Sequence, residues 1–131
     1  MYDLNRAQIL GRLVAEPELK KTKTGIDVCT ISLATNRSVK KGENEWESIP
    51  EFTNVILWQK KAEAIAKHGK KGIEVYVEGR LQTDSWEKDG VKFYKTSIVA
   101  DQLIIPNTKK TAKNDEGIME EGNENLDDLF E

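Results

Sequence analysis

The sequence has only one cysteine and one histidine among its 131 residues. Cys29 has no partner for an internal disulfide, which excludes the cysteine-rich scaffolds of small secreted proteins. Because His68 is the sole imidazole, a zinc site built from histidine and cysteine ligands is excluded as well. We therefore expect neither a disulfide framework nor a metal centre of this type.

Long hydrophobic runs are also absent. No stretch approaches the roughly 20 apolar residues that a membrane helix needs. The first residues lack the charged segment and the apolar stretch of a secretory signal. These absences predict a soluble protein of the cytoplasm that does not enter a membrane.

Charge is distributed unevenly along the chain. The last 18 residues contain eight acidic side chains and no basic one. Since the formal net charge of the whole chain is -3, the first 113 residues carry +5. A weakly basic body with an acidic end favours a polyanion-binding domain with a separate tail, and solubility alone is the competing explanation for the tail.

The change in composition falls at Pro106. Residues 98–105 are dense in β-branched side chains, whereas residues 107–131 contain too few apolar groups to offset the entropy of ordering. We predict a folded domain over residues 1–106 and a disordered linker with an acidic tail over residues 107–131. At the tip, Leu126, Leu129 and Phe130 are either a docking motif for a partner or a chance occurrence.

The body has the patterns of β-strands. Strands are expected over Arg6–Val14, Ile26–Thr35, Glu51–Trp58, Ile73–Leu81 with its continuation to Trp86, and Phe93–Ile105. A shift of apolar parity within Ile26–Thr35 suggests a β-bulge. The polar segment Ser38–Glu45 predicts an exposed hairpin loop, and Asp89-Gly90 predicts a tight turn between the last two strands.

One segment, Lys60–Lys71, has helical spacing, because Ala62, Ile65 and Ala66 form a narrow apolar stripe. Gly69 or Gly72 can end this helix. Three strands, one helix and two further strands are the element order of an OB-fold. This is an all-β, five-stranded Greek-key barrel with one short helix between strands three and four. A five-stranded sandwich is the structural competitor.

Catalytic motifs are missing. Gly69-Lys70-Lys71-Gly72 lacks the spacing and the hydroxyl residue of a phosphate-binding Walker loop. Glu74 and Glu78 share a strand face but lie about 13 Å apart, too far for a pair of hydrolytic carboxylates. No cluster of carboxylates is suited to a nuclease metal site. We expect a protein that is not an enzyme and needs no cofactor.

The aromatic residues are more informative. Phe52 and Trp58 are six residues apart, which places both on one face of their strand, while Trp46 precedes that strand and Trp86 lies in the last hairpin. Lysines are frequent near them in sequence: Lys40, Lys41, Lys60, Lys61, Lys88, Lys92 and Lys95. Exposed rings that stack on bases, together with lysines that contact phosphates, favour single-stranded nucleic acid. The alternative is that these rings fill the barrel core.

Several segments in order resemble the bacterial and phage single-stranded DNA-binding protein family over residues 4 to about 105. They are Asn5-Arg6 with Leu10-Gly11-Arg12-Leu13, Glu16-Pro17-Glu18, Ile31-Ser32-Leu33-Ala34-Thr35, Phe52 with Val55-Ile56-Leu57-Trp58, and Val75-Tyr76-Val77-Glu78-Gly79-Arg80-Leu81 with Trp86. The resemblance implies an OB-fold, a homotetramer, and binding of single-stranded DNA without sequence preference.

The resemblance also implies site residues. Family stacking positions correspond to Phe52, Trp58 and Trp86, and Trp46 is our candidate to replace a further ring at the position of Val39. Basic family positions correspond to Arg6, Lys20, Lys60 and Lys71, with Lys40 or Lys41 in the hairpin. Thr53 stands where some relatives have a histidine that helps assembly.

The tail resembles the family tips that dock onto replication and repair proteins. Asp127, Asp128, Leu129 and Phe130 keep the acidic and aromatic character, although the proline is missing and Glu131 follows the phenylalanine. The predicted function is to protect single-stranded DNA in replication, recombination and repair, and to recruit partners through this tail. An OB-fold RNA-binding module is the alternative.

Overall fold

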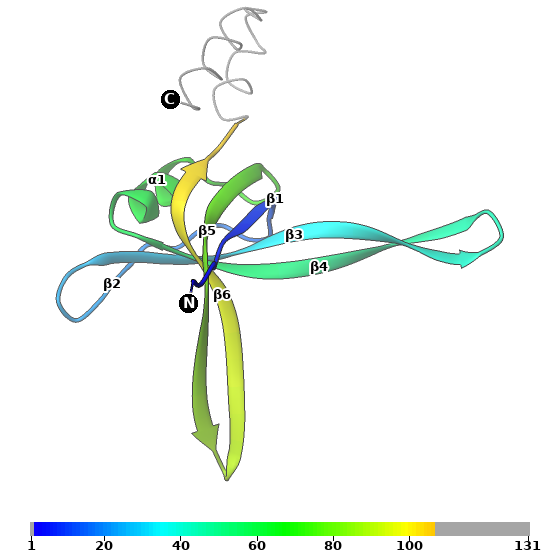
Figure 1. The fold of residues 1–131 in the computed structure, drawn as a ribbon. Coiled ribbons are helices and arrows are strands. Elements are labelled where there is room, and N and C mark those ends of the chain that lie inside the picture. Colours follow the sequence, from blue (N-terminus) through cyan, green and yellow to red (C-terminus); the bar gives the residue numbers. More distant parts are fainter. Residues whose placement is uncertain (1, 107–131) are drawn as a thin grey trace, which may run out of the picture.

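The computed structural model describes residues 2–106, which contain six strands and one helix (Figure 1). The elements are β1 (Ala7–Leu13), β2 (Lys20–Lys21), β3 (Asp27–Gly42), β4 (Glu45–Trp58), α1 (Lys60–His68), β5 (Glu74–Lys88) and β6 (Val91–Ile104). The predicted linker, acidic tail and tip motif lie outside the described residues.

Five strands close into a barrel. The sheet order is β1-β5-β6-β4-β3-β2, and β1 returns to pair with β3 through Arg12 and Leu13. The β4–β6 pairing is parallel, whereas the other pairings are antiparallel. With α1 between the third and fourth barrel strands, the OB-fold prediction is confirmed and the sandwich is excluded.

The barrel core follows from alternation along the strands. Leu33, Val55, Leu57, Val75 and Val77 point inward and are fully buried. The helix contributes two buried residues to this core, Ala62 and Ile65, which lie one turn apart on its apolar stripe. Burial of these side chains is the main stabilising contribution to the domain.

The helix is shorter than predicted, because it ends at His68 rather than Lys71. Gly69 follows as the C-cap, and its backbone N–H donates a 2.7 Å hydrogen bond to the Ile65 carbonyl. A Cβ at position 69 would lie 2.6 Å from that same carbonyl oxygen. Glycine therefore suits this position because a side chain here would clash with the carbonyl of the last helical turn.

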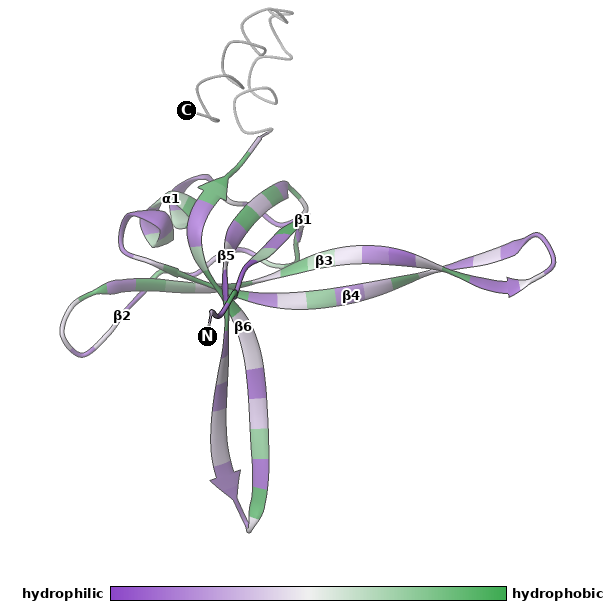
Figure 2. Cartoon of the chain, in the orientation of Figure 1, coloured by the Kyte–Doolittle hydropathy of each residue, from purple (hydrophilic) through white to green (hydrophobic). Residues whose placement is uncertain are grey.

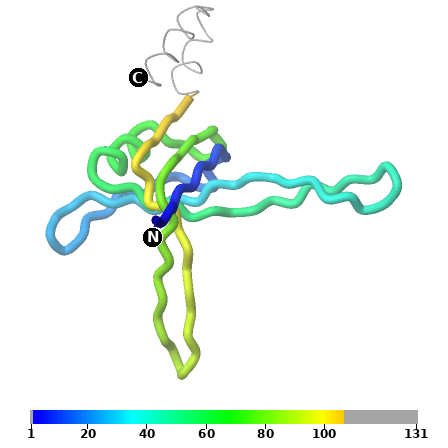
Figure 3. The backbone as a smooth tube through the Cα atoms, viewed as in Figure 1, coloured from blue at the N-terminus to red at the C-terminus, as the bar shows by residue number. Residues whose placement is uncertain are grey.

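Two long hairpins project from the barrel in different directions (Figures 1 and 3). We call residues 36–50, the outer parts of β3 and β4, the first arm. Residues 83–96, the outer parts of β5 and β6, are the second arm. The prediction of a loop over Ser38–Glu45 was wrong, because β3 continues to Gly42 and β4 begins at Glu45. Both faces of an arm meet water, so its residues are mostly hydrophilic and show no alternation (Figure 2).

The second arm was predicted correctly at its turn. Asp89 and Gly90 have φ angles of 54° and 78°, the two positive values that a type I′ turn requires. The β-bulge expected within Ile26–Thr35 was wrong, since β3 and β4 stay in register from Val28 to Lys40. The parity shift instead arises because Ile26 precedes the strand and Val28 faces outward.

Candidate nucleic-acid interface

Phe52 and Trp58 lie on the outer face of β4. Val55 and Leu57 point into the core, so the even-numbered residues of this strand point outward. Phe52 is 63% exposed and Trp58 is 41% exposed. The alternative in which these two rings fill the core is therefore excluded.

The same outer face continues across β6 and β5. Asn54 of β4 is paired with Ser97 of β6, and Ser97 is paired with Gln82 of β5. Residues paired across strands share a face, and so do residues two or four positions further along each strand. Trp86 and Phe93 are each four positions away, so they lie on the face that carries Phe52 and Trp58. We call this face the aromatic face.

Trp86 and Phe93 lie directly opposite each other on the second arm. Their rings are stacked, with centroids 5.8 Å apart and planes inclined by 19°. Trp86 is 48% exposed and Phe93 is 41% exposed, so neither ring is used in the core. The pair presents aromatic surface to solvent on an arm that has no core of its own.

Trp46 lies on the aromatic face of the first arm and is 65% exposed. Trp46, Phe52 and Trp58 recur every six residues along β4, a spacing of about 20 Å along the strand. The structure thus places all four aromatic residues predicted from the sequence on one face of the sheet.

Two of the predicted lysines share this face. Lys40 is paired with Trp46 across the first arm. Lys20 is paired with Val28, which is paired with Trp58, so Lys20 lies in the same cross-strand row as that indole. Exposed Glu18 approaches the Lys20 ammonium at 3.6 Å, while Lys40 has no ion pair within residues 2–106. Lys40 is therefore the direct cross-strand neighbour of one indole, and Lys20 is separated from the other by Val28.

Their sequence neighbours point to the opposite face and are ion-paired there. Lys21 donates a 2.6 Å hydrogen bond to Asp27, which raises the pKa of the lysine and lowers that of the carboxyl. The Lys41 ammonium lies 3.8 Å from a Glu47 carboxylate oxygen. The strand period places Lys21 on the face opposite Lys20, whereas Lys41 lies at a register shift between Lys40 and Gly42 and is placed by its contact with Glu47.

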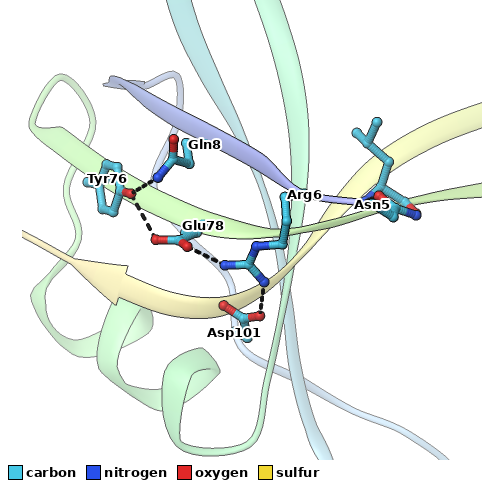
Figure 4. Close-up of polar contacts among 7 residues, drawn as sticks. Asn5, Arg6, Gln8, Tyr76, Glu78 and Asp101 are labelled. Atoms are coloured by element: carbon cyan, nitrogen blue, oxygen red, sulfur yellow. Dashed lines mark hydrogen bonds and ion pairs between the residues drawn. The ribbon is translucent and has the colours of Figure 1, made fainter. Parts of the chain in front are cut away.

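Arg6 is held by two carboxylates (Figure 4). Its guanidinium donates to Asp101 at 2.7 Å and also to Glu78. The Tyr76 hydroxyl donates to Glu78 at 3.0 Å and accepts from the Gln8 amide at 3.1 Å. The hydrogen bonds from Arg6 lower the pKa of both carboxyls, and desolvation followed by the bond to Glu78 raises the pKa of Tyr76. The positive charge of Arg6 is thus compensated by the two carboxylates of Glu78 and Asp101.

A β-bulge places one of these carboxylates. Glu78 is paired with Gln102 and Gly79 with Ala100, so Asp101 is an extra residue on β6. A Cβ at position 79 would lie 2.0 Å from a backbone oxygen of β6, and only glycine allows this approach. The bulge turns Asp101 toward Arg6.

The remaining predicted cations lie near the helix. Lys60 is the first residue of α1, two positions after Trp58, and is exposed. Lys71 lies in the turn between α1 and β5, and its backbone N–H donates to a Glu16 carboxylate oxygen at 2.9 Å. Neither belongs to an arm. DNA contacts of all the predicted site residues, Arg6, Lys41, Lys60 and Lys71 included, remain predictions.

Sequence reasoning did not assign Phe93 to the site. The signal was present, because a two-residue turn at Asp89-Gly90 makes Lys88 pair with Val91 and hence Trp86 with Phe93. Phe93 and its neighbour Tyr94 lie on opposite faces of β6. Tyr94 is paired with Ser85 on the other face, with the Lys92 ammonium 5.7 Å from its ring centroid.

A separate apolar groove lies on the outside of β1, β5 and β6. It has a volume of about 410 Å³ and is lined mainly by Leu10, Tyr76, Ile104 and Pro106. In the part of the chain that the structure describes, no group of three potential metal-ligating side chains occurs. Residues 2–106 also contain no helix long and apolar enough to cross a membrane.

Comparisons with known proteins agree with this geometry. The sequence profile of the Single-strand binding protein family matches residues 4–105. Single-stranded DNA-binding protein 1 of Staphylococcus aureus (strain MSSA476) is 37% identical over 119 residues, 90% of this chain and 75% of the relative. Single-stranded DNA-binding protein 3 of Listeria innocua is 40% identical over 108 residues, 82% of this chain and 66% of the relative.

Among solved structures, the Plasmodium falciparum SSB complex with ssDNA superposes with a TM-score of 0.72 and 31% sequence identity. The match covers 79% of this chain and 96% of that chain.

Proposed function

The chain belongs to the single-strand binding protein family, and we propose that it binds single-stranded DNA without sequence preference. The observation that carries this proposal is the aromatic face. Phe52, Trp58, Trp86 and Trp46 are exposed on one face of the sheet, which runs from the barrel onto both arms.

Stacking supplies the affinity in this proposal. Each base that stacks on an aromatic ring contributes about 1–3 kcal/mol, and every base has a π-face, so stacking is insensitive to sequence. A duplex keeps its bases stacked inside, whereas a single strand exposes them. Lys20 and Lys40, each in a row with an indole, contact phosphates beside the stacked bases.

The biological role is to cover and protect single strands during replication, recombination and repair, in the cytoplasm. The protein performs no chemistry on the strand. The acidic tip, with Asp127, Asp128, Leu129 and Phe130, recruits replication and repair proteins. This assignment is supported by the tip's resemblance to family tails and by the separation of acidic residues from the basic domain.

We infer that copies of the chain assemble, as a homotetramer. Among the described residues, β1 pairs with β3 only at Arg12 and Leu13, so the first part of β1 has a strand partner on one side alone. The apolar groove beside it leaves Leu10 exposed. A free edge next to apolar surface suits a second copy. Light scattering should give four subunits, and Leu10→Glu should reduce that number.

The test of function is a titration of intrinsic fluorescence with oligo-dT and oligo-rU. Stacked indoles should be quenched, and dT should bind more tightly than rU. Trp58→Ala and Trp86→Ala should each weaken binding with the fold intact, as judged by circular dichroism. Tighter binding of rU would favour the RNA-binding alternative, and unchanged affinity in both variants would remove the aromatic face from the proposal. Cleavage of labelled DNA in magnesium would contradict a non-catalytic role.

A further inference from the structure

We propose that Phe93 is a DNA-binding residue that forms a two-ring stacking site with Trp86 on the second arm. This inference rests on the proposed function and adds a residue to it. It assigns the end of the second arm a defined contact, a nucleobase stacked against the ring pair.

The first argument is position. The type I′ turn at Asp89-Gly90 and the unbroken register from Gly79 to Lys88 place Phe93 directly opposite Trp86. Phe93 is therefore on the aromatic face for the same reason as Trp86. Its neighbour Tyr94, which is 64% exposed, is on the opposite face.

The second argument is the geometry of the rings. Because the rings are stacked on each other, each has one face covered by its partner and the other face directed outward. The contact restrains both side chains on an arm where no core side chains surround them. Restraint before binding lowers the entropy lost when a base stacks. The outward ring faces are the surface that remains for bases.

The third argument is charge. Lys88 and Lys95 lie two positions from Trp86 and Phe93 on the same face, one toward the turn and one toward the barrel. Lys95 is paired with Asp84, while Lys88 is paired with Val91. The ring pair is thus flanked along the arm by two ammonium groups that can contact the phosphates on either side of a stacked base.

The experiment compares neighbouring residues on the two faces. Phe93→Ala should weaken binding of oligo-dT by about fivefold or more, the lower bound for one stacked base, while Tyr94→Ala stays within twofold of wild type. Phe93→Tyr should retain affinity. Phe93→Leu, which keeps apolar bulk without a π-face, should lose it.

A spectroscopic readout separates stacking from a general effect on the arm. With Trp46 and Trp58 both replaced by phenylalanine, Trp86 is the sole tryptophan and its fluorescence reports this site. Oligo-dT should quench it, and Phe93→Leu should reduce the quench more than Phe93→Tyr does. If Phe93→Ala does not fold, the comparison of Leu with Tyr at this position decides.

Each outcome has one meaning. If wild-type protein fails to bind dT, the proposed function is wrong. If wild type binds dT and both Phe93→Ala and Phe93→Leu bind it as tightly as wild type does, the inference is overturned while the function stands. Equal losses for Phe93→Ala and Tyr94→Ala would also overturn it, since the effect would then concern the whole arm rather than one face.

Discussion

The Arg6 guanidinium donates a 2.7 Å hydrogen bond to the Asp101 carboxylate, which lies 95 residues later in the chain. The same guanidinium binds Glu78 on β5. The segment before β1 is therefore joined to the last two barrel strands by ion pairs. Arg6, which the sequence suggests as a phosphate contact, has a structural role in this geometry.

This cluster predicts a pH dependence of stability. The folded-state pKa values of Glu78 and Asp101 are lowered by Arg6, so their contribution is complete above the unfolded values near pH 4. It is lost as the pH falls through the lower folded values. Arg6→Gln should lower the thermal midpoint at pH 7, and the difference from wild type should shrink below about pH 4.

Arg37→Gln is the control, because within residues 2–106 Arg37 forms an ion pair with one carboxylate, that of Glu51. Its effect on the thermal midpoint should be smaller than that of Arg6→Gln. A difference between Arg6→Gln and wild type that stays constant from pH 7 to pH 3 would mean that Arg6 acts by packing rather than by charge.

The neighbouring lysines Lys20 and Lys21, and likewise Lys40 and Lys41, predict that the salt dependence of DNA binding differs between the two faces. Lys20→Ala and Lys40→Ala should each reduce the slope of log affinity for oligo-dT against log salt by about 0.7, the value for one phosphate contact on a single strand. Lys21→Ala and Lys41→Ala remove the same charge from the face opposite the exposed indoles, beside Asp27 and Glu47, and should leave the slope unchanged. If the variants of two neighbouring lysines reduce the salt slope equally, net charge rather than the position of the lysine controls binding.

Two adjacent residues of β4 should separate stability from binding. Leu57 is fully buried, so Leu57→Ala should reduce the free energy of unfolding by about 2–5 kcal/mol. Trp58→Ala should change it by less than about 1 kcal/mol but weaken DNA binding by about 1–3 kcal/mol. Urea denaturation and fluorescence titration measure the two effects. A large loss of stability in Trp58→Ala would assign that ring to the core.

The backbone conformation at Gln59 predicts that one substitution there stabilises the fold. This residue joins β4 to α1 with φ 56° and ψ -122°, a region that favours glycine. Its N–H donates to the Asp27 carbonyl at 2.8 Å and its carbonyl accepts from the Glu63 N–H at 3.0 Å, which hold the backbone in place. Gln59→Gly should raise the free energy of unfolding by about 1 kcal/mol through relief of strain.

Gln59→Ala is the matched variant, because it keeps the Cβ and therefore the strain. Its free energy of unfolding should equal that of wild type. Thermal midpoints measured at one protein concentration compare the two, and equal midpoints for the glycine and alanine variants would refute strain at this position.

The barrel could be predicted from the sequence because one face of each barrel strand is buried. Val75 and Val77 alternate with polar residues for this reason, and the Asp89-Gly90 turn has a local chemical cause. The first arm could not be predicted, since a hairpin with water on both faces has no hydrophobic period. Ser38–Glu45 therefore resembled a loop, although Ser38, Val39, Lys40 and Gly42 each have a partner in the β3–β4 ladder.

The amino-acid sequence by itself determined the β-class, the order of strands and helix, the tight turn and the presence of aromatic rings among lysines. The tertiary structure alone decided that Lys20 lies in a row with Trp58, that the outer face of β4 continues onto β6 and β5, and that Arg6 pairs with Asp101. The reason is physical. Local preferences act within a few residues, whereas the face and the partner of a side chain depend on register between strands that are distant in the chain.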